Sequence, residues 1–276
     1  MTVGIVGLGL IGGSFAKAYH EAGATVLAWN RSRSVLDFAI MSGAVDAELT
    51  EDNIAACDLV LIALYPEATI EWFRRMAPHI GAHPVVLDCG GTKRTICAAC
   101  FPIAKEHGVT FLGGHPMAGT QYSGFKNAKA TMYHGAPMVI VPPDFDDVLL
   151  FDHVKQLLQP AGFARFSFTT AEAHDEMIAF TSQLAHVASH AYIKSPTPKK
   201  HKGFSAGSYK DMTRVAWLAP HMWAELFMEN KEFLLKEIDC YIEHLSEYKT
   251  AMENDDEETL IRLLDEGKKR KEEVDG

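Results

Sequence analysis

Short apolar runs alternate with amphipathic segments along the first 168 residues of the chain. Such runs, rich in Val, Ile and Leu, predict strands that are buried on both faces of a parallel sheet. The strands are predicted at residues 2–6, 25–29, 58–64, 84–87, 109–112, 137–141 and 164–168. Segments with apolar residues three and four positions apart predict helices between the strands. These helices are predicted at residues 15–22, 35–42, 67–80, 93–107 and 146–158.

The pattern changes after Thr170, where strand-like runs stop and helical spacing dominates. Further helices are predicted at residues 173–193, 209–219, 220–252 and 257–273. The predicted fold class is therefore α/β. A doubly wound, mostly parallel sheet occupies residues 1–168, and an all-α domain occupies residues 169–276.

A glycine-rich turn, Gly7-Leu8-Gly9-Leu10-Ile11-Gly12, joins the first predicted strand to the first predicted helix. In this G-x-G-x-x-G arrangement the first glycine permits a tight turn and the second lets the backbone approach a pyrophosphate. The third lets helix and strand pack closely. The helix N-terminus that follows offers free N–H groups to phosphates. The sequence thus predicts a Rossmann-type dinucleotide site that includes Gly7, Gly9, Leu10, Ile11 and Gly12.

The end of the second strand bears on the choice of dinucleotide. Sites for NAD usually carry Asp or Glu at this point, bonded to the ribose 2′-hydroxyl. The chain has Asn30, Arg31, Ser32 and Arg33 instead. Without a carboxylate to repel a 2′-phosphate, and with two guanidinium groups to receive one, NADP is predicted over NAD. NAD remains the alternative, in which Arg31 and Arg33 are solvated loop charges.

Other small or stiff segments are expected at the same carboxyl edge of the sheet. They are Leu64-Tyr65-Pro66, Gly90 with Gly91 and Thr92, and His115 within Gly113–Gly119. His115 is predicted in a loop just past a strand end, between glycines and a proline that let a ligand approach closely. Its side chain titrates near neutral pH, so a catalytic base is one interpretation. A loop histidine that caps a strand is the other.

Two places in the helical half carry polar or charged side chains on otherwise apolar helices. His186 and His190 share one helix face, but no carboxylate partner accompanies them, so no metal site is expected. A satisfied core histidine is the alternative for His186. Arg214 lies among apolar residues and calls for an anionic partner. That partner is Asp211, Glu225 or a ligand carboxylate.

The composition of the chain disfavours several classes of function. The chain has 276 residues, 47% of them hydrophobic, and a formal net charge of −10, which disfavours general nucleic-acid binding. Five cysteines form no even framework and are interpreted as free thiols of a reducing cytosol. No leader or membrane-spanning run is recognised, so a cytoplasmic protein is expected.

Four segments together resemble the prephenate/arogenate dehydrogenase family of tyrosine biosynthesis, and most closely a monofunctional prephenate dehydrogenase. They follow one another in the expected order across nearly the whole chain. The segments are Gly7–Ser14, Gly114–Gly119, Leu184–His186, and Lys210–Ala216 followed by Trp223 and Glu229–Lys231.

The resemblance implies an oxidative decarboxylation with hydride transfer to NADP or NAD. His115 would take the proton of the prephenate 4-hydroxyl as hydride leaves C4, and carbon dioxide would depart to give 4-hydroxyphenylpyruvate. Arg214 would hold a substrate carboxylate, and His186 would contact the substrate. The helical domain would form a homodimer interface. The substrate-binding residues implied are His186, Arg214, Gln121, Gly207 and Trp223.

Two departures from the family pattern leave alternatives open. The family usually has Ser where this chain has Gly91, so Thr92 is proposed as the catalytic partner of His115. Gln121 replaces a Glu of several prephenate-specific members, so arogenate remains an alternative substrate. A β-hydroxyacid dehydrogenase is disfavoured because residues 173–193 contain no Lys. A non-catalytic dinucleotide sensor would not need His115, His186 and Arg214 together.

Overall fold

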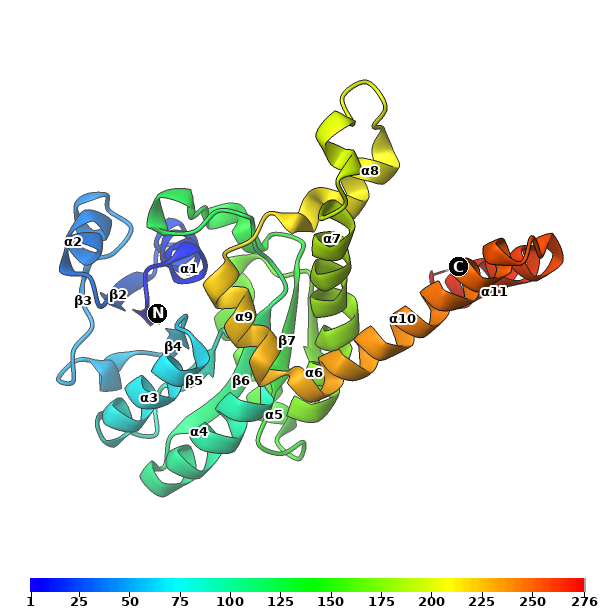
Figure 1. Ribbon diagram of the computed structural model, residues 1–276. Coiled ribbons are helices and arrows are strands. Elements are labelled where there is room, and N and C mark those ends of the chain that lie inside the picture. Colours follow the sequence, from blue (N-terminus) through cyan, green and yellow to red (C-terminus); the bar gives the residue numbers. More distant parts are fainter. Residues whose placement is uncertain (276) are drawn as a thin grey trace.

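A computed structural model describes residues 1–275 and shows an eight-stranded sheet flanked by helices, followed by a helical domain (Figure 1). Gly276, the last residue of the predicted second domain, lies outside the described residues. The strands are β1 (Thr2–Val6), β2 (Thr25–Trp29), β3 (Ala47–Glu48), β4 (Leu59–Ile62), β5 (Val85–Asp88), β6 (Thr110–Pro116), β7 (Pro137–Val141) and β8 (Arg165–Phe168). Their spatial order is β3-β2-β1-β4-β5-β6-β7-β8.

The predicted doubly wound, mostly parallel sheet is confirmed. All neighbouring strands run parallel except β6 and β7, which are antiparallel. Helices cover both faces, as the apolar runs require. They are α1 (Leu10–Glu21), α2 (Arg33–Met41), α3 (Pro66–Ile80), α4 (Arg94–His107) and α5 (Val148–Leu158).

Successive residues of β1 enter different cores. Ile5 packs with Phe15 and Tyr19 of α1, whereas Val6 packs with Trp72 and other residues under α3 and α4. Each such side chain, fully buried, contributes about 1.5–3 kcal/mol to folding. The two cores hold the carboxyl ends of the central strands level with one another.

The helical domain consists of more segments than the sequence predicts. Its elements are α6 (Ala171–Ile178), the π-helix η5 (Ala179–Leu184), α7 (Ala185–Ile193), the 3₁₀-helix η6 (Thr197–Lys200), α8 (Gly207–Thr213), the 3₁₀-helix η7 (Arg214–Ala216), α9 (Pro220–Glu229), α10 (Lys231–Glu253) and α11 (Glu257–Asp275). The helix predicted at 173–193 therefore contains a π segment. The helix predicted at 209–219 ends at residue 213 in α-helical form, and the helix predicted at 220–252 is broken at Asn230.

The break at Asn230 has a clear cause. Its side chain is fully buried, and its Nδ2 donates to the Asp175 carbonyl at 2.7 Å and to Gln183 Oε1 at 2.8 Å. Gln183 Nε2 in turn donates to the carbonyl of Leu226 at 3.1 Å. These bonds fix α9 against α6 and η5, so α10 leaves in a new direction.

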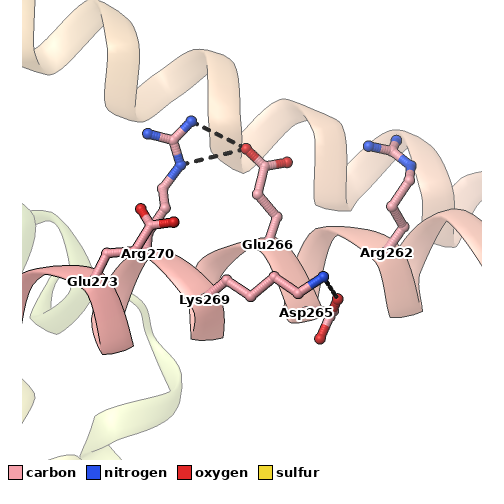
Figure 2. A pocket seen from close by; sticks show the side chains of 6 residues that line it. All are labelled: Arg262, Asp265, Glu266, Lys269, Arg270 and Glu273. Atoms are coloured by element: carbon pink, nitrogen blue, oxygen red, sulfur yellow. Dashed lines mark hydrogen bonds and ion pairs between the residues drawn. The ribbon is translucent and has the colours of Figure 1, made fainter. Parts of the chain in front are cut away.

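Helices α10 and α11 project away from the sheet as an arm (Figure 1). Figure 2 shows charged side chains along one face of α11, where Lys269 pairs with Asp265 at 2.7 Å and Arg270 with Glu266 at 3.2 Å. Such pairs one helical turn apart are typical of a solvated face. No helix within residues 1–275 is both long and apolar enough to cross a membrane.

Candidate active site

The glycine turn after β1 has the shape that a dinucleotide phosphate needs. Gly7 has φ +91°, and a Cβ there would lie 2.6 Å from the Ala63 carbonyl oxygen. A Cβ on Gly12 would collide with the Gly7 carbonyl oxygen, whereas one on Gly9 would meet nothing within 4 Å. The N-terminus of α1 has no side-chain cap and no acidic residue in its first turn. The turn therefore combines tight packing beneath it with open space and free N–H groups above it.

The end of β2 presents fewer free cations than the sequence suggests. Asn30 Oδ1 accepts the backbone N–H of Leu8 at 2.9 Å and ties β2 to the glycine turn. Arg33 pairs with Asp37 at 2.9 Å and Glu48 at 2.5 Å. Arg31 is exposed and forms no ion pair with the carboxylates of residues 1–275. Of the two predicted phosphate ligands, Arg31 is thus the one whose charge is available.

The remaining predicted cofactor residues lie on the same edge. Val6, Ile62 and Asp88 are level with one another across β1, β4 and β5. Leu64 touches the position that a Gly7 Cβ would take. Other predicted residues lie where helices begin after these strands: Ser32 precedes α2, Tyr65 precedes α3, and Pro66 is the first residue of α3. Gly90, just after β5, donates its N–H to Asp88 Oδ2 at 2.8 Å.

His115 lies within β6, and the prediction of a loop past the strand end is wrong. Strand β5 ends at Asp88, but β6 continues because β7 pairs with it, placing His115 opposite Val139. A Cβ on Gly114 would collide with the Asp88 carbonyl oxygen, so glycine lets the two chains approach there. Gly114 also donates its N–H to Asp88 Oδ1 at 3.1 Å. The imidazole is thus held on a strand, with less freedom than a loop would allow.

A chain of polar side chains runs from His115 into the helical domain. His115 Nδ1 lies 2.8 Å from His174 Nε2, and His174 Nδ1 lies 2.7 Å from Asp175 Oδ1. Asp175 also accepts the backbone N–H groups of Lys93 at 2.7 Å and Arg94 at 2.9 Å. His174 and Asp175 were not among the site residues predicted from the sequence. A signal was present, since Ala171, His174, Asp175 and Ile178 form the buried i, i+3, i+4, i+7 face of α6.

The surroundings keep His115 neutral. Burial lowers its pKa well below the ordinary value, and the nearby His174 and Lys93 lower that pKa further. Burial also lowers the pKa of His174, which Asp175 only partly offsets. For Asp175, burial would raise the pKa, but hydrogen bonds from His174 and from the Arg94 and Lys93 backbone outweigh it and lower the pKa. A neutral imidazole that is linked through His174 to an ionised carboxylate is suited to accept a proton.

A buried ion pair between Lys93 and Asp88 lies close to these polar side chains. The Lys93 ammonium contacts Asp88 Oδ2, and both side chains are fully buried. The Asp88 carboxylate also receives the N–H groups of Gly90 and Gly114. Every charge in the pair therefore has a partner, as burial demands.

Three of the predicted substrate residues come together in the helical domain. The rings of His186 and Trp223 stack with centroids 3.7 Å apart, and His186 Nδ1 donates to the Ser182 carbonyl at 2.9 Å. The segment η7, which carries Arg214, packs against α7, which carries His186. Burial lowers the pKa of His186, and the charges of His190 and Arg214 lower that pKa further. Arg214 is exposed and forms no ion pair with Asp211, Glu225 or any other carboxylate in residues 1–275.

In the described part of the chain, the other two predicted substrate residues have no contact with His115 or His186 through a hydrogen bond. Gln121 lies on the exposed segment after β6, and Gly207 is the first residue of α8. Within residues 1–275, no hydrogen bond joins either residue to His115 or His186. The same residues contain no cluster of His, Cys, Asp and Glu side chains that could hold a metal ion.

Comparison with known proteins identifies the family. Residues 15–166 match the model of the prephenate dehydrogenase nucleotide-binding domain, and residues 170–266 match that of the prephenate dehydrogenase dimerization domain. The chain belongs to the prephenate dehydrogenase family. The resemblance carried by the sequence motifs is thus confirmed.

Relatives match over most of the chain. Prephenate dehydrogenase of Bacillus subtilis is 28% identical over 95% of this chain and 73% of its own length. Cyclohexadienyl dehydrogenase of Zymomonas mobilis is 29% identical over 97% of this chain and 94% of its own. The structure of A. aeolicus prephenate dehydrogenase in complex with hydroxyphenyl propionate and NAD+ is similar to this structure, with a TM-score of 0.81. The sequence identity is 26%, and the match covers 100% of this chain and 98% of that chain.

The first departure from the pattern of the prephenate dehydrogenase family, at Gly91 and Thr92, now has a structural setting. A Cβ on Gly91 would lie 3.4 Å from Leu226 of α9, so the position has room for a serine. The Thr92 hydroxyl donates to Glu229 Oε2 on α9. Burial raises the pKa of Glu229, although the bond from Thr92 opposes this. The proposal that Thr92 bonds the substrate therefore requires its hydroxyl to leave Glu229.

Proposed function

We propose that this chain oxidatively decarboxylates prephenate to 4-hydroxyphenylpyruvate, with hydride transfer to a nicotinamide dinucleotide, in tyrosine biosynthesis. The observation that carries the proposal is the neutral His115 imidazole, held on β6 at the same sheet edge as the phosphate-binding turn. The names of the matched relatives support the same reaction.

The chain's own part in the reaction is to position and deprotonate the substrate. When bound, the dinucleotide accepts the hydride from C4. His115 takes the proton of the 4-hydroxyl, and the ring carboxylate leaves as carbon dioxide while the ring becomes aromatic. An imidazole that stays neutral at pH 7 is available for this step in every molecule of enzyme. Positioned general bases contribute about 10²–10⁴-fold to rate.

Anionic groups of the substrate need cationic partners in the helical domain. Arg214 has an exposed guanidinium without a protein carboxylate, and it lies near the His186–Trp223 stack. In this proposal Arg214 binds a substrate carboxylate, and His186, Trp223, Gln121 and Gly207 complete the substrate-binding surface. Thr92 remains the proposed partner of His115 at the 4-hydroxyl.

Arogenate is the alternative substrate, supported by the cyclohexadienyl dehydrogenase relative and by the neutral Gln121. The deciding experiment measures reduced-dinucleotide absorbance with prephenate or arogenate, each with NADP or NAD. A higher kcat/KM on prephenate is expected. Turnover of neither substrate with either dinucleotide would refute the proposal. It would also leave open the two remoter alternatives, a β-hydroxyacid dehydrogenase and a dinucleotide sensor.

We further propose NADP as the preferred dinucleotide and Arg31 as the residue that receives its 2′-phosphate. Arg31→Ala is expected to raise KM for NADP about 10-fold or more, because one charge-assisted hydrogen bond contributes about 1.5–3 kcal/mol. KM for NAD should change little. Arg33→Ala is the matched control, since Asp37 and Glu48 already engage that side chain. A lower KM for NAD in the unaltered enzyme would contradict the preference.

Arg214→Ala is expected to raise KM for prephenate about 10–100-fold with a smaller change in kcat, because it removes a charged hydrogen bond that substrate and transition state share. Steady-state kinetics over a wide prephenate range will measure both constants. Arg74→Ala on α3, an exposed arginine outside the site, controls for loss of a surface charge. An unchanged KM would return Arg214 to the role of a solvated side chain.

A homodimer is proposed through the helical domain. The family model of that domain is named for dimerization, and several large apolar side chains on α9, α10 and α11 are exposed in the single chain. They are Met228, Leu235, Ile242, Leu245, Ile261 and Leu264. Large apolar side chains exposed on neighbouring helices are typical of interfaces. Sedimentation of the purified protein as a monomer would contradict this proposal.

A further inference from the structure

We propose that His174 and Asp175 are positioning residues that fix the tautomer of His115, with the proton on Nδ1 and a bare Nε2 that receives the substrate proton. The inference deepens the proposed function, because the bare nitrogen acts on whichever hydroxyl the substrate presents. It assigns a role to a His-Asp pair that lies outside the dinucleotide turn and outside the substrate-binding residues.

The direction of the hydrogen bonds from Asp175 through His174 to His115 follows from the state of the Asp175 carboxyl group. Asp175 Oδ1 accepts the Lys93 N–H, and Oδ2 accepts the Arg94 N–H, with Arg94 Nε 3.5 Å from Oδ2. All these partners are donors, and together with His174 they outweigh the effect of burial and hold the pKa of the Asp175 carboxyl below its ordinary value. Asp175 is therefore an ionised acceptor, and His174 Nδ1 must carry a proton and donate it at 2.7 Å.

The rest of the assignment is forced by the neutral states of both rings. A neutral imidazole has one N–H and one acceptor nitrogen, so His174 Nε2 is an acceptor. The atom 2.8 Å from it, His115 Nδ1, must then be the donor. His115 Nε2, on the far side of the ring from His174, is left with a lone pair. His174 is buried and His115 is partly exposed, so the free nitrogen belongs to the ring that a substrate can reach.

The imposed tautomer differs from the one an isolated neutral histidine prefers, which carries its proton on Nε2. Without His174, the proton would occupy the nitrogen that has to accept one from the substrate. In the Ser-His-Asp triad, an aspartate holds its histidine in the required tautomer, and the wrong tautomer there costs about 10⁴-fold in kcat. Here a second imidazole lies between the carboxylate and the reacting ring.

The positioning groups reach His115 across the domain boundary. His115 belongs to β6 of the sheet, whereas His174 and Asp175 belong to α6 of the helical domain. The other charged groups around this chain are Lys93 before α4, Asp88 of β5 in its ion pair with Lys93, and Glu229 of α9 on Thr92. The domain interface thus orients the proton acceptor.

The tautomer can be observed without substrate. Full-length enzyme labelled with ¹⁵N in histidine is examined by NMR near pH 7, and His115→Asn identifies the His115 signals. We expect Nδ1 of His115 protonated and Nε2 bare. In His174→Phe we expect the proton on Nε2. A protonated Nε2 in the unaltered enzyme, or an unchanged tautomer in His174→Phe, would overturn the proposal.

Kinetics supply a second test. His174→Phe is expected to lower kcat about 100-fold, with KM for prephenate and for dinucleotide within about 2-fold. In His174→Gln the amide oxygen takes the place of Nε2 and accepts the His115 proton, so at least about 10-fold of kcat should return. His153→Phe, an exposed histidine on α5, should leave kcat unchanged. Equal losses in the Phe and Gln variants would show that His174 acts only through packing.

The two proposals fail separately. If the unaltered enzyme oxidises neither prephenate nor arogenate, the proposed function fails, while the NMR measurement still reports the tautomer. If turnover is normal but Nε2 carries the proton, the proposed function stands and the positioning role falls.

Discussion

Replacing His115 with Asn is expected to lower kcat by about 10²–10⁴-fold while the affinity for dinucleotide stays nearly unchanged. The asparagine amide can still donate to His174 Nε2, so the strand and the polar chain behind it are preserved. What is lost is the lone pair that receives the substrate proton. Single-turnover absorbance measures the chemical step, and dinucleotide fluorescence measures binding. Turnover within tenfold of the unaltered enzyme would show that His115 is not the base.

The pH dependence of kcat/KM in the unaltered enzyme and in His115→Asn gives a second test of His115 as the base. His115 acts only when neutral, so kcat/KM falls once the pH drops below its pKa. Burial, His174 and Lys93 hold that pKa well below the ordinary value, so the acid limb of the profile should lie below pH 6.5. The limb assigned to His115 should be missing from the Asn variant. An acid limb that is identical in both enzymes would belong to another group.

Local sequence patterns were sufficient to predict the glycine turn and the alternation of strands and helices along the first domain. Gly7 and Gly12 are required by contacts with Ala63 and with the turn itself, and both follow from the strand–turn–helix context. The apolar runs gave the central strands because burial on both faces leaves no polar positions. His115 was recognised as a candidate base from its small neighbours and its family motif, both of which are local in sequence.

Contacts between distant residues were beyond such patterns. The extension of β6 to His115 depends on pairing with Val139 of β7, which the run at residues 109–112 does not reveal. His174 lies 59 positions from His115, and Glu229 lies 137 positions from Thr92. The break at Asn230 depends on its bonds to α6 and η5, since the sequence around it has continuous helical spacing. In each case tertiary contacts determined the outcome.

Removing one partner of the buried Lys93–Asp88 pair should cost more stability than breaking any of the exposed ion pairs within residues 1–275. Lys93→Met is expected to lower the free energy of unfolding by about 3–5 kcal/mol, because it leaves the Asp88 carboxylate buried without its cation. Urea denaturation followed by circular dichroism will measure this change. Lys249→Met is the matched control, since Lys249 pairs with Glu253 at 2.6 Å on an exposed helix face.

A second substitution separates the loss of the pair from the loss of lysine packing. In Lys93→Met with Asp88→Asn, the asparagine oxygen still accepts a backbone N–H from Gly90 or Gly114, and no charge remains buried. The double variant should therefore be more stable than Lys93→Met alone. Lys93 also lowers the pKa of His115, so its removal should move the acid limb of kcat/KM to higher pH. Equal stability of the Lys93→Met and Lys249→Met variants would contradict the assignment of Lys93 as the paired cation beneath the active site.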